Sequence, residues 1–184
     1  MKINDIIAFS SATNTQDTLM IFSSKGKMYR LLVDNIPEGN NNSIGVPLST
    51  LITFEDNETP MAYTTLTRDT NKKFIFFATK KGIVKKVPLE EYDAMKRTGI
   101  VSIKLKDGDE LAAVTFINQE EMILVTKNGM TIRFNTAEMP ISSRTAQGVK
   151  GMNISDDDSE DIEELKANSW RYQAGEPVNQ DNGI

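Results

Sequence analysis

Residues 23–30 read Ser23-Ser24-Lys25-Gly26-Lys27-Met28-Tyr29-Arg30, and the chain repeats this pattern twice. The two further copies are Thr79-Lys80-Lys81-Gly82-Ile83-Val84-Lys85-Lys86 and Thr126-Lys127-Asn128-Gly129-Met130-Thr131-Ile132-Arg133. Each copy follows an apolar run and precedes a run in which apolar and polar residues alternate. A short Lys/Asn-Gly turn between two such runs indicates a β-hairpin whose glycine takes a positive φ.

A second glycine follows each turn glycine at a nearly constant distance. Each second glycine opens another strand-like run, such as 45–48, then comes an acidic turn and a closing strand, as in 111–116. Four short strands in about 50 residues match a propeller blade. The pairs are Gly26 and Gly45, 19 residues apart, Gly82 and Gly99, 17 apart, and Gly129 and Gly148, 19 apart.

We therefore expect an all-β, propeller-like fold of three repeat units with about four strands each. The repeat region should span residues 1–158, with units at about 18–66, 73–117 and 121–166. Residues 5–9 resemble a closing strand left over from an earlier unit. Since a closed propeller normally has at least four blades, three units predict an open or partial disc. Residues 159–184 should form an acidic, polar and partly mobile tail.

The composition narrows the possible functions. The chain has no Cys and no His, which excludes disulfides, thiol nucleophiles, Ser-His-Asp triads and the usual zinc ligand sets. Acidic pairs such as Glu90-Glu91 are typical of solvated turns, and no set of carboxylates, Lys or Tyr has the spacing of a catalytic site. We expect a non-catalytic protein without metal or cofactor. No apolar run is long enough to span a membrane, and no signal peptide is present, which favours the cytoplasm.

The charge is unevenly distributed. Up to Lys150 the chain has 19 Lys and Arg against 17 Asp and Glu, whereas the remainder has 2 against 9. A mildly basic body is thus followed by an acidic tail. The tail could shield an open blade edge or compete with an acidic ligand for the basic body.

Several stretches resemble the C-terminal domain of the bacterial DNA gyrase A subunit, and the paralogous topoisomerase IV subunit is a close second. They occur in the family's order, and together they span about residues 5–158. The resemblance implies a β-pinwheel, a disc whose blades exchange strands and whose basic outer rim bends or wraps duplex DNA. It also implies that the catalytic Tyr and the ATPase of the ATP-dependent topoisomerase lie elsewhere in the assembly. The matching stretches are 22–31, 35–38, 78–86, 107–111, 132–134 and 147–151.

Duplex DNA is therefore the expected partner, near the bacterial nucleoid, together with the rest of a gyrase or topoisomerase IV assembly. Phosphate neutralisation by Lys and Arg gives affinity without strict sequence preference. A single lysine could equally be a solubilising charge on a strand edge, but recurrence at equivalent positions favours DNA. The candidate contacts are Lys25, Lys27, Arg30, Lys80, Lys81, Lys85, Lys86, Lys96, Arg97, Lys127, Arg133, Arg144 and Lys150.

Three departures from the family pattern weaken a simple carry-over of the family's properties to this chain. The gyrase heptapeptide Gln-Arg-Arg-Gly-Gly-Lys-Gly is missing, and Gly39-Asn40-Asn41-Asn42-Ser43 stands where the family has basic residues. The last closing strand, expected after Asp158, is acidic and has poor strand propensity. The alternative function is a degenerate or standalone protein-interaction module that has lost DNA wrapping. Binding to linear duplex DNA at two salt concentrations separates the two functions.

Overall fold

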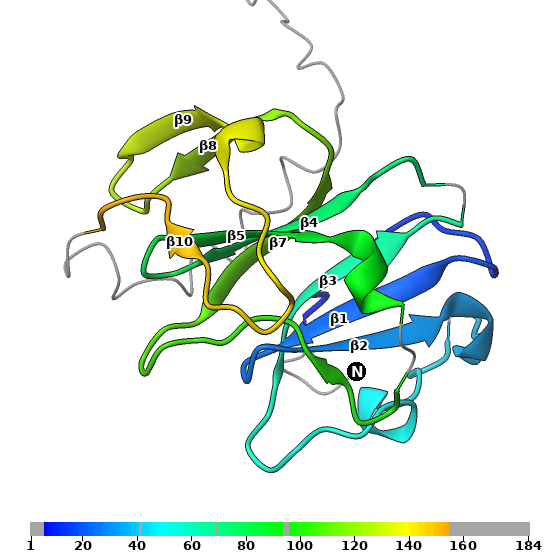
Figure 1. The fold of residues 1–184 in the computed structure, drawn as a ribbon. Helices are drawn as coiled ribbons and strands as arrows, with labels where there is room; N and C mark the ends of the chain where they lie inside the picture. The colour runs from blue at the N-terminus through cyan, green and yellow to red at the C-terminus, as the bar shows by residue number, and fades with distance from the viewer. Residues whose placement is uncertain (1–5, 41, 69, 94–95, 155–184) are drawn as a thin grey trace, which may run out of the picture.

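The computed structural model describes residues 6–40, 42–68, 70–93 and 96–154 (Figure 1). This part of the chain contains ten β-strands and four short 3-10 turns, labelled η, and no helix long and apolar enough to cross a membrane. The strands are β1 (Thr18–Ser23), β2 (Lys27–Leu32), β3 (Pro60–Leu66), β4 (Phe74–Thr79), β5 (Ile83–Pro88), β6 (Ile100–Val101), β7 (Leu111–Ile117), β8 (Glu121–Val125), β9 (Thr131–Asn135) and β10 (Val149–Lys150). The 3-10 turns are η1 (Val33–Asn35), η2 (Leu48–Thr50), η3 (Leu89–Tyr92) and η4 (Thr136–Glu138).

The three turn glycines form the predicted hairpins. Gly26, Gly82 and Gly129 have φ values of 68°, 77° and 83°, in the left-handed region that glycine enters at little cost. The N–H of Gly26 donates to Ser23 O at 2.9 Å, and the other two glycines make the equivalent bond. These turns join β1 to β2, β4 to β5 and β8 to β9. The local sequence therefore determines the hairpin at the centre of each unit.

The hairpins belong to three sheets that follow one another across the molecule, from the blue strands to the yellow strands in Figure 1. Blade 1 has the order β3-β1-β2-β6, blade 2 the order β10-β5-β4-β7, and blade 3 consists of β8 and β9. All named strand pairs are antiparallel. The structure thus confirms an all-β fold of three units that form an open, partial pinwheel.

Neighbouring units exchange strands. The short strand β6 comes from the second unit but pairs with β2 of blade 1, where Ile100 lies opposite Met28. In the same way, β10 of the third unit pairs with β5 of blade 2, where Val149 lies opposite Val84. Each complete sheet therefore contains three strands of its own unit and one short strand donated by the next unit.

Two predicted strands are not formed. Residues 45–48 of the first unit contain no strand, and their last residue starts η2 instead. The equivalent runs in the other units become β6 and β10 because each pairs with a preceding hairpin, and no described residue precedes blade 1 as such a partner. Residues 6–9 also form no strand, although Phe9 stacks on Tyr63 of β3 at 5.6 Å. The predicted closing strand and tail after Asp158 lie outside the described residues.

The hydrophobic core lies between the blades. One cluster joins Met20 and Phe22 of blade 1 to Ile75 and Phe77 of blade 2, and the Phe22 and Phe77 rings meet edge to face at 5.5 Å. A second cluster packs the other face of blade 2 against β8 and β9. A third covers the outer face of blade 1, where Ile52 packs on its own sheet. Stacked faces thus bury apolar area in the manner of propeller blades.

Candidate nucleic-acid interface

Several of the turn lysines are paired with the acidic turn of their own unit. Lys27 Nζ lies 2.5 Å from a Glu55 oxygen, and Lys25 Nζ lies 3.3 Å from the other oxygen. Hydrogen bonds from Lys27 and Lys25 lower the pKa of the Glu55 carboxyl. In the second unit, Lys80 pairs with Glu110 at 2.9 Å. Much of the positive charge predicted at these turns is therefore balanced locally.

The basic residue four positions after each turn glycine connects one blade to the next. Arg30 donates from Nη1 to Tyr92 O at 2.9 Å, at the end of η3 in the second unit. Lys86 donates to Thr136 O at 2.5 Å, at the start of η4 in the third unit, and burial lowers its pKa. Arg133 is the third member of this set. Its side chain is 73% exposed, and its Nε lies 3.8 Å from Glu121.

Lys85 is completely buried and holds the loop that carries the donated strand of the third unit. Its Nζ donates to Ser102 O at 2.8 Å and to Ala146 O at 3.0 Å, and also to Arg144 O. Burial lowers its pKa to about 8. Neither Lys85 nor Lys86 has the exposure that a phosphate contact requires, so we leave both out of the proposed DNA surface.

The remaining predicted contacts differ in their surroundings. Lys96 is exposed, and Arg97 is exposed but donates to Thr50 O at 3.0 Å. Lys81 is exposed and donates to Asp107 O at 3.2 Å. Arg144 is half-buried and donates to Val101 O, and its own N–H donates to Glu91. Lys127 is half-buried at the turn of blade 3.

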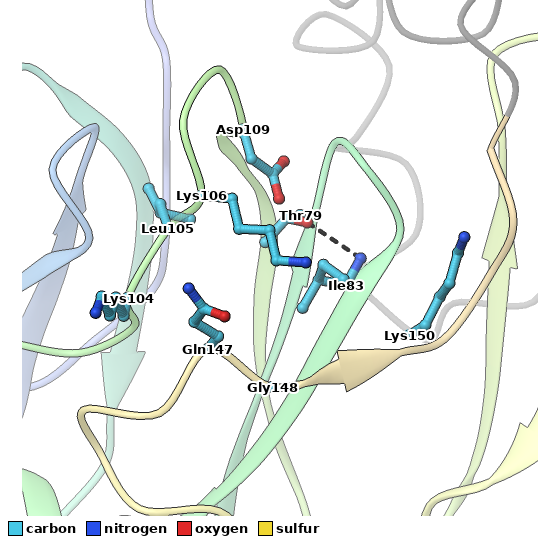
Figure 2. Close-up of a pocket in the computed structure, with 9 residues that line it drawn as sticks. All are labelled: Thr79, Ile83, Lys104, Leu105, Lys106, Asp109, Gln147, Gly148 and Lys150. Carbon is cyan, nitrogen blue, oxygen red and sulfur yellow. Dashed lines mark hydrogen bonds between the residues drawn. The ribbon is translucent and has the colours of Figure 1, made fainter.

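A basic groove lies where blades 1 and 2 meet the donated strands. Its central hollow, of about 180 Å³, is lined by Lys104, Lys106 and Lys150 with Gln147 and by the buried Thr79 and Asp109. Figure 2 shows Lys106 extending over this hollow, with Lys104 on one side and Lys150 on the other. A second, wider hollow shares Lys104 and Lys106 and continues to Lys25 at the turn of blade 1. We call Lys25, Lys104, Lys106, Gln147 and Lys150 the basic groove.

Three of the groove lysines are less neutralised than the turn lysines, whereas the fourth, Lys25, pairs with Glu55. Within the described residues, no carboxylate lies within ion-pair distance of Lys104, Lys106 or Lys150. Three exposed ammonium groups beside one hollow suit a ligand with several phosphates. Of these, only Lys150 was among the predicted contacts. The sequence feature that could have identified Lys104 and Lys106 is the alternation Ile103-Lys104-Leu105-Lys106. Ile103 is buried and Leu105 half-buried, so both lysines are exposed.

The buried carboxylates near the turns have structural roles. Glu58 accepts hydrogen bonds from Tyr29 OH and from Glu55 N, both at 2.7 Å, and from Ser23 Oγ. In the second unit, Asp109 accepts bonds from Lys81 N at 3.0 Å and from Glu110 N. No group of three or more potential metal ligands occurs among the described residues. The hydrogen bonds to Glu58 and Asp109 hold the turns in place.

The chain matches the family described as DNA gyrase C-terminal domain, beta-propeller, over residues 17–59, 73–118 and 120–159. It is 35% identical over 150 residues to the DNA gyrase A subunit of Halalkalibacterium halodurans, a match covering 81% of this chain and 18% of that protein. It is 33% identical over 166 residues to the DNA gyrase A subunit of Haemophilus influenzae, covering 86% of this chain and 19% of that protein. The chain thus spans about a fifth of these relatives.

Two solved structures share the fold. The C-terminal domain of DNA topoisomerase IV superposes with a TM-score of 0.68 and 29% identity, covering 78% of this chain and 45% of that one. The C-terminal domain of DNA gyrase A superposes with a TM-score of 0.66 and 26% identity, covering 78% and 46%. The three matched segments fall on the three hairpin units and include more than half of the chain. The chain belongs to the family of DNA gyrase A C-terminal β-propeller domains.

Proposed function

We propose that this chain binds duplex DNA without strict sequence preference, through the basic groove and the exposed basic residues around it. The observation that carries the proposal is the set of Lys104, Lys106 and Lys150 around one hollow, with Lys25 on its continuation. Ammonium groups neutralise phosphates and release counterions without reading base edges. The chain would act next to DNA in the cytoplasm as a non-catalytic, DNA-bending part of a gyrase A-type topoisomerase.

Membership of the family supports this function, because the relatives are DNA gyrase A subunits. The geometry supports a narrower DNA surface than the sequence predicted. Lys85 and Lys86 are buried. Lys27 and Lys80 pair closely with carboxylates and are mostly covered, whereas Lys25 lies farther from Glu55 and stays exposed. The surface therefore combines the basic groove with Lys81, Lys96 and Arg97, which are all exposed.

Fluorescence anisotropy with a labelled linear duplex tests the proposal. Four phosphate contacts predict a slope of log K against log salt of about −3.6, and so roughly a 100-fold weaker affinity at 200 mM than at 50 mM salt. The variant Lys104→Ala/Lys106→Ala should weaken binding at 50 mM salt and make this slope shallower by about 2.

The matched control is Lys72→Ala/Lys73→Ala, which removes the same charge at the start of β4, away from the groove. It should keep the slope of the unmodified chain. Equal losses in both double variants would show a diffuse charge effect and contradict the groove. No binding at 50 mM salt would instead favour a protein-interaction module.

The acidic residues after Asp158 offer a second test. We expect them to compete with DNA for the basic groove, since 6 acidic side chains against two basic ones follow Asp158. Removing residues 159–184 should then tighten DNA binding at low salt, and the gain should shrink as salt rises. Unchanged or weaker affinity of the shortened chain would contradict the competition.

A further inference from the structure

Each of the two blade interfaces contains a donated strand. In the first, β6 pairs with β2, and Ser102 N donates to Gly26 O at 2.7 Å. In the second, β10 pairs with β5, and Gly151 N donates to Gly82 O at 2.9 Å. The acceptor is in both cases the second strand of a hairpin, directly after the turn glycine. The donor is in both cases the pair of residues after the second glycine of the next unit.

Each interface also contains a cation and an apolar contact. Arg30 reaches Tyr92 O across the first interface, and Lys86 reaches Thr136 O across the second. One face of each hairpin packs against the next sheet, as Phe76 of blade 2 does against Phe134 of blade 3 at 6.4 Å. Three contacts therefore recur between consecutive blades: a strand, a cation and an apolar face.

Blade 3 carries one half of all three contacts without the other half. No described strand pairs with the outer edge of β9. Arg133 extends into solvent. Ile123 and Val125, which occupy the positions of Phe76 and Ala78, are 59% and 61% exposed, whereas their counterparts are buried.

Blade 1 carries the complementary halves. Val46 stands one residue after the second glycine, as Ile100 and Val149 do, but it is 45% exposed and belongs to no strand. The turn η1 follows β2 as η3 follows β5, so it can offer carbonyl groups to a cation. Ile52 and Phe54 lie six and four residues before the buried Glu58, as Ile103 and Leu105 do before the buried Asp109. Ile103 and Leu105 pack in the first interface.

The register of the missing pair follows from the two pairs that are present. Ile100 faces Met28, and Val149 faces Val84. Met28 and Val84 each lie two residues after a turn glycine, as Thr131 lies two residues after Gly129, so Val46 should face Thr131. Met130 O accepts a bond from Thr126 N at 2.8 Å, which directs Met130 towards β8 and the N–H and C=O of Thr131 towards the free edge.

Proline at position 47 is compatible with this register. Ser102 N bonds to Gly26 O, so the alternation of an antiparallel ladder leaves the N–H of the preceding residue, Val101, pointing away from β2. Pro47 stands at the position of Val101, where the absence of an N–H removes no ladder bond.

We propose that a second copy of this chain supplies the missing halves, so that two copies close one six-bladed disc by mutual strand donation. Val46 of each copy pairs with Thr131 of the other, and the exposed face of Ile123 and Val125 packs against the half-buried Phe54, next to Ile52, which already packs on its own sheet. Six blades lie within the four to eight that closed propellers use. The match to the gyrase A domain covers 46% of that domain, so two copies supply about as much chain.

The two ends lie on opposite sides of one molecule, so they cannot pair within it. In Figure 1 the cyan segment that contains η2 is at the lower right, and β9 is at the upper left. Mutual donation between two copies satisfies both open ends at once and leaves no free edge for further growth. The proposal depends on these contacts and not on DNA binding.

Light scattering of the full chain during gel filtration in high salt without DNA tests the assembly. We expect twice the 20.5 kDa mass of one chain. Thr131→Pro should give the single-chain mass, because proline removes the N–H at the free edge and leaves the pairing with β8 intact. The matched control, Thr131→Val, loses the hydroxyl but keeps the N–H and should remain a dimer.

Cysteine crosslinking tests the register, because the chain contains no Cys. Opposite residues of an antiparallel pair have Cα atoms about 5.5 Å apart, which suits a disulfide. A mixture of Val46→Cys chains and Thr131→Cys chains should form a covalent heterodimer under oxidation. Neither variant alone, nor Val46→Cys mixed with Glu138→Cys, should crosslink to a comparable extent.

Three results would overturn the proposal. A single-chain mass of the unmodified protein would do so. A dimer that persists in Thr131→Pro would locate the interface elsewhere. Species larger than a dimer would show that donation continues from copy to copy without closing the disc.

Discussion

Blades 2 and 3 start from the same sequence pattern and reach different states. Blade 2 has four strands, and both of its faces are packed against neighbours. Blade 3 has two strands among the described residues, and Ile123 and Val125 on its outer face are exposed. Since the hairpins are equivalent, the difference comes from the neighbouring blades. A unit of this fold is completed by the next unit, and its own sequence supplies only part of its sheet.

The largest expected effect compares one position on the outer faces of the two blades. Phe76 and Ile123 both lie six residues before their turn glycine, but Phe76 is buried between blades 2 and 3. In the Thr131→Pro background, Phe76→Ala should lower the free energy of unfolding by about 3–5 kcal/mol because it leaves a cavity. Ile123→Ala should lower it by less than about 1 kcal/mol. Urea unfolding followed by circular dichroism measures both, and equal losses would contradict the comparison.

The turn glycines separate the cost of backbone conformation from the cost of a donated strand. A Cβ on Gly82 would lie 2.3 Å from Met152 O, whereas a Cβ on Gly129 meets nothing within 4 Å. Both residues have a positive φ, so in the Thr131→Pro background, where the edge of blade 3 is open, Gly129→Ala should cost about 1–2 kcal/mol of stability. Gly82→Ala must also displace the donated segment and should cost roughly 2–4 kcal/mol. Urea unfolding measures the difference, and a larger loss at Gly129 would be inconsistent with the open edge of blade 3.

The cation four residues after the turn glycine provides a smaller test. Lys86→Met removes the donor to the buried Thr136 O and should lower the free energy of unfolding by about 1–3 kcal/mol. Arg133→Met, also in the Thr131→Pro background, should change it by less than about 0.5 kcal/mol, because this side chain is exposed. A neutral result for Lys86→Met would indicate that the bond across the interface adds nothing to stability.

The last comparison is a pH dependence that belongs to blade 2. The folded chain releases the Lys85 proton near pH 8, whereas the unfolded chain keeps it to an ordinary value of 10.5. The unfolded state therefore binds more protons between these values, and the free energy of unfolding should rise from pH 8 to about 10. Above pH 10 the gain is opposed, because burial raises the pKa of both Tyr29 and Tyr92.

Urea unfolding of the chain and of Lys85→Met at several pH values measures this effect. The variant should lose the rise between pH 8 and 10. Glu91 and Arg144 are the charged groups that also act on the Lys85 amine, with opposite effects on its pKa. An unchanged rise in Lys85→Met would assign the pH dependence to another group.

Local sequence patterns predicted the elements whose geometry is local. Gly26, Gly82 and Gly129 set the hairpins because a positive φ is a property of the residue itself. The burial and pairing of the predicted DNA contacts could not be derived from a local pattern. The recurrence of basic residues selected Lys25 and Lys150, which line the proposed groove, but it also selected Arg30 and Lys86, which bond to carbonyl groups of the next unit. A recurring cation can equally be a recurring contact between repeats.

The sequence by itself determined three hairpin units, their all-β class and their family, because turn chemistry and alternation act over a few residues. Only the tertiary structure decided which unit each short strand joins and which lysines remain in water. Residues 45–48 could not be distinguished from β6 or β10 by pattern, since the outcome depends on a partner strand. Long-range pairing and burial depend on the neighbouring blade, and a local window of sequence does not contain that neighbour.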